Sequence, residues 1–151
     1  MSLGNAALEA TLDRVAEDLA QANRVLFITG AGLSADSGLP SYRGVGGLYE
    51  GVATAEGLPI ETVLSGSMFQ QRPELTWKYL LQVEKACRSA SCNAGHRIIA
   101  RLESKVEKVV VLTQNVDGLH RAAGSTQVID IHGDLRDLRC TRCSRTRRVQ
   151  S

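Results

Sequence analysis

Hydrophobic positions along the chain follow two kinds of pattern. Residues 7–22 place apolar side chains at helical spacing with charged residues between them, which predicts an amphipathic helix with one buried face. Residues 25–29, 109–113 and 128–131 are short apolar runs rich in branched side chains. Such runs are typical of buried strands in a parallel sheet.

Two further helices and a loop are predicted between these runs. Pro73 suits the first turn of a helix that continues through Val83. A second helix follows Asn93, and the residues expected to point inward from it are Ile98, Ile99 and Leu102. Residues 45–57 are rich in glycine and predict a loop. Strands that alternate with helices imply right-handed crossovers and an α/β fold with a parallel sheet.

A glycine or polar motif directly follows each predicted strand. Gly30 follows the first strand, Gln114 the second and His132 the third. Ligands of open parallel sheets bind at the carboxyl ends of the strands. The three motifs are therefore expected to build one site at this edge of the sheet.

The first motif, Gly30-x-Gly32-x-x-Ala35, has the small residues of a dinucleotide-binding turn. Gly30 allows a tight turn, and Gly32 lets the backbone approach a pyrophosphate. The hydroxyl of Ser34 could bind the same phosphate oxygens. A tight turn without a ligand is the alternative. Glu50, about 20 residues on, falls in the glycine-rich loop and not at a strand end, so an ordinary dehydrogenase is not expected.

The segment after this turn ends on a charge. Pro40 should stop a helix early, and Arg43 would bring a permanent positive charge close to phosphate or carboxylate. A solvated loop arginine is the alternative interpretation of Arg43.

The motifs TQNVDGLH and IHGD supply the remaining polar groups. The amides of Gln114 and Asn115 and the carboxylate of Asp117 could bind a carboxamide or sugar hydroxyls, or could cap the next segment. His120 ends the first motif. His132 stands where a general base would face a ligand, although a single histidine can also be structural.

Composition, charge and the N-terminal sequence argue against a membrane-spanning or secreted protein. The 151 residues carry a net charge of +2 and no apolar run long enough to cross a bilayer. The N-terminal residues lack the features of a signal peptide, which predicts a cytoplasmic protein. Cys140-Thr-Arg-Cys143 then indicates metal or redox chemistry and not a disulfide scaffold.

Four motifs in this order, GAGLSADSGLPSYRG, TQNVDGLH, HG and CTRC, resemble those of the sirtuin (Sir2) family of NAD-dependent protein deacylases, bacterial type. The stretch CNAGHRIIARLE also resembles the family, and the resemblance runs from about residue 8 to the end. It implies a Rossmann-like parallel sheet with helices on both faces over residues 1–133, with a helical and loop insertion around 45–90. Residues 134–151 would begin a small zinc-ribbon domain. Three strands are about half of the family's sheet, so a C-terminal truncation, an open edge and an uncovered apolar face are expected.

The resemblance also implies roles for individual residues. The residues expected to contact NAD are Gly30, Ala31, Gly32, Ser34, Tyr42, Arg43, Gln114, Asn115, Asp117 and His132. The expected catalytic residues are His132 as general base, with Asn115 and Asp117 on the nicotinamide carboxamide. Tyr79 is followed at the third position by Gln82 and not by the arginine of desuccinylating members, which favours acetyl or another neutral acyl group.

The implied activity is lysine deacetylation or deacylation, in which the acyl group passes to ADP-ribose and nicotinamide leaves. Cys140 and Cys143 would be two of four structural zinc ligands, and Cys87 and Cys92 do not fit the remaining two. The implied partners are acyl-lysine proteins, with self-assembly if the chain is naturally truncated. The alternatives are a catalytically weak NAD-binding protein and, less favoured, a zinc-ribbon nucleic-acid binder. Neither a membrane nor nucleic acid is an expected partner.

Overall fold

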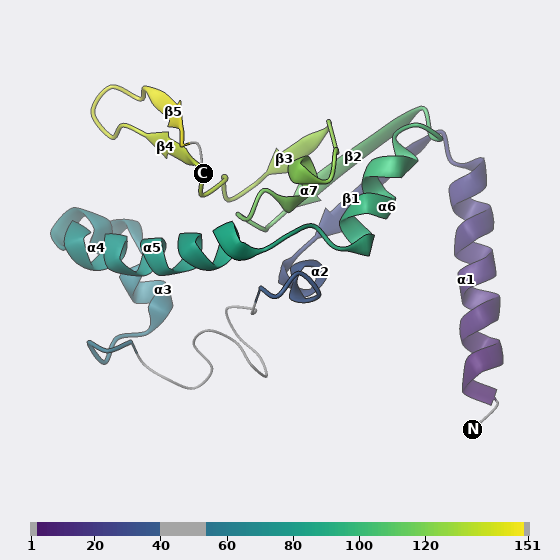
Figure 1. Cartoon of the computed structure of the whole chain (residues 1–151), viewed down its shortest axis with the longest axis horizontal. Helices are drawn as coiled ribbons and strands as arrows, with labels where there is room; N and C mark the ends of the chain where they lie inside the picture. Colours follow the sequence, from purple (N-terminus) through teal and green to yellow (C-terminus); the bar gives the residue numbers. More distant parts are fainter. Residues whose placement is uncertain (1–2, 40–53, 150–151) are drawn as a thin grey trace.

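The computed structural model describes residues 3–39 and 54–149 (Figure 1). The elements in chain order are α1 (Leu3–Gln21), β1 (Arg24–Thr29), α2 (Ala31–Ala35), α3 (Ile60–Val63), α4 (Gly66–Gln71), α5 (Pro73–Ser89), α6 (Ala94–Leu102), β2 (Lys108–Thr113), α7 (Leu119–Ala122), β3 (Val128–Asp130), β4 (Asp137–Arg139) and β5 (Thr146–Arg148). In the described part of the chain, no helix is long and apolar enough to span a membrane.

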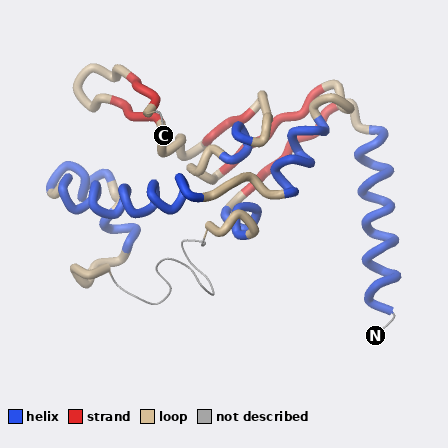
Figure 2. The backbone as a smooth tube through the Cα atoms, in the orientation of Figure 1, coloured by secondary structure: helices blue, strands red, loops and turns tan. Residues whose placement is uncertain are grey.

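Three parallel strands form the sheet, in the order β1-β2-β3. Figure 2 shows them side by side, with the helices around them. Thr29 pairs with Thr113, and Thr113 pairs with Asp130, so the three strands reach their carboxyl ends at the same level. The predicted α/β class, the parallel sheet and the common edge are confirmed.

The two faces of the sheet differ in their cover. Val109 and Val111 of β2 are buried on one face. On the other face, Leu26 and Ile28 of β1 are 56% and 67% exposed, and Ile129 of β3 is 51% exposed. This is the uncovered apolar face expected from the sequence.

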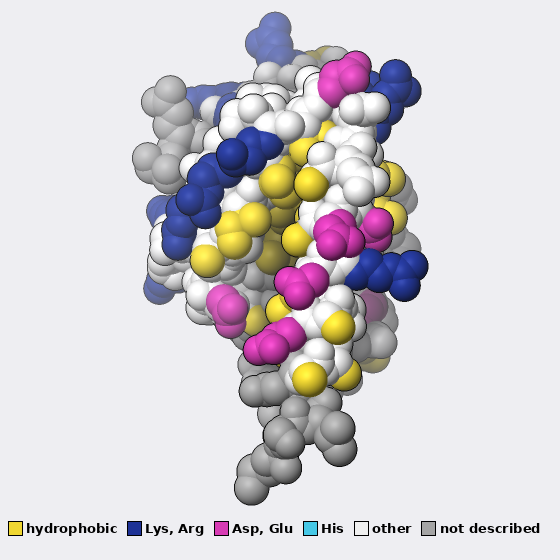
Figure 3. All heavy atoms as spheres, turned by 90° about the vertical axis from the view of Figure 1, so that its right-hand side faces the viewer, with side chains coloured by type: hydrophobic (Ala, Val, Ile, Leu, Met, Phe, Trp, Pro, Cys, Tyr) yellow, Lys and Arg dark blue, Asp and Glu magenta, His cyan; other side chains and the backbone are white. Residues whose placement is uncertain are grey.

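Helix α1 exists as predicted, but its apolar stripe is not buried. Leu8 and Leu12 are each 57% exposed, and Val15 is 49% exposed. Figure 1 shows α1 standing beside the sheet, and Figure 3 shows hydrophobic side chains open on this side of the molecule. The prediction of a buried face is wrong for the described chain, because helical spacing reports amphipathicity whereas burial also needs a partner surface.

Helices α3, α4 and α5 form a separate packed unit. Its core consists of Ile60, Val63, Leu75 and Tyr79. The hydroxyl of Thr76 on α5 donates to the carbonyl of Val63 at 2.7 Å, inside this core. Helix α5 begins at Pro73 as predicted, while the short helices α3 and α4 were not predicted. In the expected loop 45–57, residues 54–57 form a turn and residues 45–53 lie outside the described part.

Helix α6 begins after Asn93, as predicted, with a capping box between Asn93 and His96. Ile99 points inward and is buried, but Ile98 is 50% exposed, so the prediction for Ile98 is wrong. Adjacent positions on a helix differ by about 100° in direction, so the orientation that buries Ile99 turns Ile98 toward the edge of the contact.

Residues after β3 form an antiparallel hairpin of β4 and β5. Cys140 and Cys143 lie in its loop and are exposed. The loop is closed by hydrogen bonds from Cys140 N to Arg145 O at 2.8 Å and from Ser144 N to Cys140 O at 3.0 Å.

Candidate functional site

A cavity of about 270 Å³ lies at the carboxyl ends of the strands. The side chains that line it come from all three predicted motifs and from α5. They are Ala31, Ser34, Leu39, Val83, Ala86, Cys87, Gln114, Asn115, Val116, Asp117 and His132. The three motifs therefore line one cavity at this edge of the sheet.

Hydrogen bonds connect the glycine-rich turn to the TQNVDG segment. The side-chain amide of Asn115 donates to Gly30 O and to Ser34 Oγ, both at 3.0 Å. The hydroxyl of Ser34, which is buried, donates to Asp117 Oδ2 at 2.7 Å. The other carboxylate oxygen of Asp117 accepts from Leu119 N at 2.9 Å. Two segments more than 80 residues apart are thus held together by side chains that also line the cavity.

These contacts determine which atoms remain for a ligand. Both N–H groups of the Asn115 side chain are used inside the protein, so this side chain offers its oxygen. Each carboxylate oxygen of Asp117 takes one protein donor and keeps further acceptor capacity. At this point the cavity presents hydrogen-bond acceptors, which suit a ligand that carries N–H groups.

The glycine-rich turn is open where it faces away from the protein. Neither Gly30 nor Gly32 has a positive φ, and a Cβ atom added at either would meet no atom within 4 Å. Internal packing in the described chain therefore does not explain why these positions are glycine. The backbone at both glycines is open to close approach of a ligand.

His132 is exposed and lines the cavity. It is placed by the turn at Gly133, which has φ +82° and donates its N–H to Asp130 O at 3.1 Å. The imidazole stands at the end of β3, on the same cavity as Asn115 and Asp117.

His120, the last residue of the TQNVDGLH motif, does not line the cavity. Its Nε2 lies 2.9 Å from Thr29 Oγ1, and its ring meets that of His96 edge-on with centroids 4.9 Å apart. Both rings are almost fully buried. Burial lowers the pKa of both imidazoles, and they remain neutral at pH 7. His120 therefore belongs to the packed interior and not to the cavity.

Helix α5 forms one wall of the cavity, which the sequence patterns did not predict. Val83, Ala86 and Cys87 lie on one face of the helix and line the cavity. Burial raises the pKa of the Cys87 thiol to about 11, and the charge of Asp117 adds to the shift, so the thiol is protonated. The spacing of these three residues was a usable signal, but it does not tell which element a helix face will meet.

Two groups of predicted site residues are not brought into this cavity. Tyr42 and Arg43 lie outside the described residues, as does Pro40. Cys140 and Cys143 lie on the hairpin, and the described residues contain no group of three or more histidine, cysteine or acidic side chains placed to hold a metal. Two thiols do not make the closed four-ligand set of a structural zinc site.

Comparisons with known proteins identify relatives of the chain. The model of the Sir2 family matches residues 30–151. NAD-dependent protein deacylase 2 of Pseudomonas aeruginosa is 56% identical over 131 residues, which cover 85% of this chain and 51% of that protein. The protein of the same name from Pseudomonas syringae pv. tomato is 55% identical over 133 residues, or 87% and 53% of the two chains. The chain therefore spans about half the length of the curated relatives it matches.

Solved structures give the same result. A Sir2 homologue in complex with NAD superposes with a TM-score of 0.78 and 34% identity, over 92% of this chain and 52% of that one. A mutant Sir2 homologue in complex with ADP-ribose superposes with a TM-score of 0.80 and 34% identity, over 91% and 53%. With the family match covering most of its length, the chain belongs to the Sir2 family.

Proposed function

We propose that this chain carries the NAD site of a protein lysine deacetylase or deacylase, which transfers the acyl group of lysine to ADP-ribose and releases nicotinamide. The observation that carries the proposal is the network of Asn115, Ser34 and Asp117 on the cavity that His132 also lines. The names of the relatives and the ligands of the similar structures point the same way.

The residues of the site fit parts of NAD. The open backbone at Gly30, Ala31 and Gly32, with Ser34 beside it, suits the phosphates. Gln114 would contact the nicotinamide ribose. Tyr42 and Arg43 remain predicted contacts from the cofactor loop.

Asn115 and Asp117 are proposed to recognise the nicotinamide carboxamide. Both side chains have acceptor atoms left, which can receive its N–H groups. The acid analogue of nicotinamide has no N–H group and carries a negative charge toward Asp117. The site should therefore favour the amide over the acid.

NAD supplies the ADP-ribose acceptor and the nicotinamide leaving group. In this chemistry, His132 would take a proton from a ribose hydroxyl, and the walls of the cavity would restrict the entry of water. The α5 wall of Val83, Ala86 and Cys87 is uncharged because the Cys87 thiol is protonated. A neutral acyl group, such as acetyl, fits such a wall better than a succinyl group.

The finer assignments are part of the same proposal. Acyl-lysine proteins would be the substrates, and the location would be cytoplasmic. Cys140 and Cys143 would be two of the four ligands of a structural zinc ion. A domain boundary near residue 133 would separate the sheet from the hairpin.

Mass spectrometry of the chain with NAD and an acetyl-lysine peptide tests the proposal. We expect O-acetyl-ADP-ribose and nicotinamide, with a loss of ~10²–10⁴-fold in His132→Ala. A matched control is Arg142→Ala on the exposed hairpin loop, which should leave turnover unchanged. NAD that protects against unfolding without any product would indicate a binding protein, and no protection at all would contradict the proposed site.

A further inference from the structure

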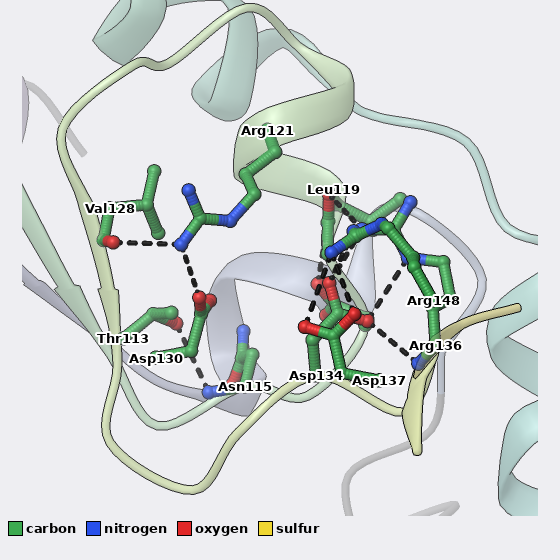
Figure 4. A network of polar contacts seen from close by, with 12 residues as sticks. Thr113, Asn115, Leu119, Arg121, Val128, Asp130, Asp134, Arg136, Asp137 and Arg148 are labelled. Carbon is green, nitrogen blue, oxygen red and sulfur yellow. Dashed lines mark hydrogen bonds and ion pairs between the residues drawn. The ribbon is translucent and has the colours of Figure 1, made fainter. Parts of the chain in front are cut away.

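Asp134, two residues after His132, is a buried carboxylate beside the candidate site. Its side chain is 2% exposed. Oδ1 accepts from Arg136 N at 2.9 Å and Arg136 Nε at 3.0 Å, and Oδ2 accepts from Arg136 Nη2 at 2.7 Å and Arg148 Nη2 at 3.0 Å. Figure 4 shows the two guanidinium groups converging on this carboxylate. We call Asp134, Arg136 and Arg148 the Asp134 cluster.

The cluster rests directly on the turn that carries Asp117. Arg136 Nη2 lies 3.3 Å from the carbonyl oxygen of Gly118, to which it donates. A Cβ atom at Gly118 would overlap with the Arg136 guanidinium and lie 2.9 Å from Asp134 Oδ2. Gly118 also has φ +69°. Glycine at this position therefore leaves the space in which the arginine sits.

Backbone contacts join the same two segments. Leu135 N donates to Val116 O at 3.0 Å. The segment that follows His132 is thus tied to the Asn115–Gly118 turn at two points, one through the main chain and one through Arg136.

The β4–β5 hairpin is attached through the same carboxylate. Arg148 of β5 bonds to Asp134 and also to Asp137 of β4, with an Nη1–Oδ1 distance of 2.9 Å. Val149 N donates to Arg136 O at 2.7 Å. One buried acid therefore connects the hairpin, the segment after His132 and the Asp117 turn.

The charge state of Asp134 is consistent with this arrangement. Burial by itself raises the pKa of the carboxyl, but the hydrogen bonds from Arg136 and the charges of Arg136 and Arg148 outweigh it, so the pKa lies below its ordinary value. Removing a partner would leave a buried charge without compensation, which is strongly unfavourable.

We propose that Asp134 and Arg136 are positioning residues of the NAD site. Their ion pair contacts Gly118 and holds the Asn115–Gly118 turn in place relative to His132 and to the β4–β5 hairpin. The inference rests on the proposed function, because the turn matters for catalysis if it binds the nicotinamide carboxamide.

Four variants test it. Asp134→Asn and Arg136→Gln break the ion pair, whereas Arg136→Lys keeps the charge and loses the paired contacts. Asp137→Asn is the matched control, because Asp137 is 47% exposed and its side chain pairs with Arg148 outside the buried carboxylate. Amide hydrogen exchange of residues 115–119 and 135 measures how ordered the turn is without any ligand. The affinity for NAD measures whether the binding site is intact.

We expect Asp134→Asn and Arg136→Gln to speed exchange in these residues and to weaken NAD binding, each by about tenfold, with no change in α5. Arg136→Lys should recover part of both effects, and Asp137→Asn should match the wild type. If Asp134→Asn does not fold, Arg136→Gln decides, since that side chain is 33% exposed.

Exchange at wild-type rates in Arg136→Gln would overturn the proposal. So would faster exchange spread equally over α5 and the sheet, because it would show general destabilisation. A wild-type chain that binds no NAD would refute the proposed function, while the exchange measurement would still decide whether the ion pair orders the turn.

Discussion

Replacing Asn93 with alanine should loosen the glycine-rich turn as well as helix α6, because one side chain supports both. Asn93 Oδ1 accepts from His96 N at 3.2 Å and caps the helix. Its Nδ2 donates to Leu33 O at 2.6 Å and to Ser37 Oγ at 3.1 Å, on the segment that follows Gly32. A residue at the start of α6 thus holds the turn proposed to bind the phosphates.

The size of the effect follows from these contacts. Loss of an N-cap costs about 1 kcal/mol, and each lost hydrogen bond costs about 1 kcal/mol. Asn93→Ala should therefore lower the free energy of unfolding by roughly 3 kcal/mol. Asn93→Asp separates the two roles, because aspartate caps equally well but cannot donate to Leu33 O. We expect it to cost roughly 2 kcal/mol.

Urea unfolding followed by circular dichroism measures both variants. Ser89→Ala is a suitable control, because Ser89 lies in the last turn of α5 and its exposed hydroxyl bonds only to Ala86 O among the contacts described. If Asn93→Asp were as stable as the wild type, the two bonds to the turn would contribute nothing. If it were as unstable as Asn93→Ala, the cap would contribute nothing.

Three further predictions concern buried contacts near the site. Burial lowers the pKa of His96 and His120 below the value of about 6.5 in the unfolded chain. The unfolded chain then binds more protons than the folded chain. The stability that comes from the neutral rings is therefore complete above pH 6.5 and is lost as the pH falls below it. An unfolding midpoint in urea that stays the same between pH 7.5 and 5.5 would contradict this prediction. Ser34→Ala, which removes the bridge to Asn115 and Asp117, should weaken NAD binding by about tenfold in calorimetry, and unchanged affinity would show that the bridge is dispensable. Gly118→Ala should lower the thermal midpoint with a cost of roughly 1–3 kcal/mol, through its positive φ and its overlap with Arg136, and a wild-type midpoint would refute that account.

The parts of the fold that sequence patterns predicted are those with strong local signals. The three strands are short branched apolar runs. Helix α5 begins at Pro73 and α6 begins directly after its N-cap Asn93, and both residues are start signals in themselves. Helices α3 and α4 have four and six residues, too few to be stable alone. They depend on the core that Ile60 and Val63 of α3 form with Leu75 and Tyr79 of α5, a contact that no local pattern records.

The same distinction applies to the burial of helices. Helix α1 has the apolar stripe that its sequence predicts. Leu8 and Leu12 in this stripe are nevertheless exposed, because burial depends on a partner surface. Val83 and Cys87 were recognisable as one face of α5, but their place on the cavity depends on where α5 lies against the TQNVDG segment.

One rule predicted part of the site, namely that ligands of parallel sheets bind at the carboxyl ends of the strands. The rule predicted that the motifs at Gly30, Gln114 and His132 would come together, and Ala31, Gln114 and His132 do line one cavity, because parallel strands in register end together. The same rule favoured His132 over His120, because His132 directly follows a predicted strand whereas His120 ends a longer polar motif. The distinction arises from α7, which turns His120 toward Thr29 and His96, whereas the turn at Gly133 keeps His132 at the cavity.

At Asn115, the fold also decides which atoms of the side chain can bind a ligand. Its residue type suggested a carboxamide ligand, but an amide can donate or accept, and the type alone leaves both open. In the structure, Gly30 O and Ser34 Oγ take both of its donors, so its oxygen is what remains for the ligand. The chemistry of the site is thus decided by contacts between residues 81 and 85 positions apart. A sequence motif can name the side chains of such a site, while the fold determines which of their atoms are available.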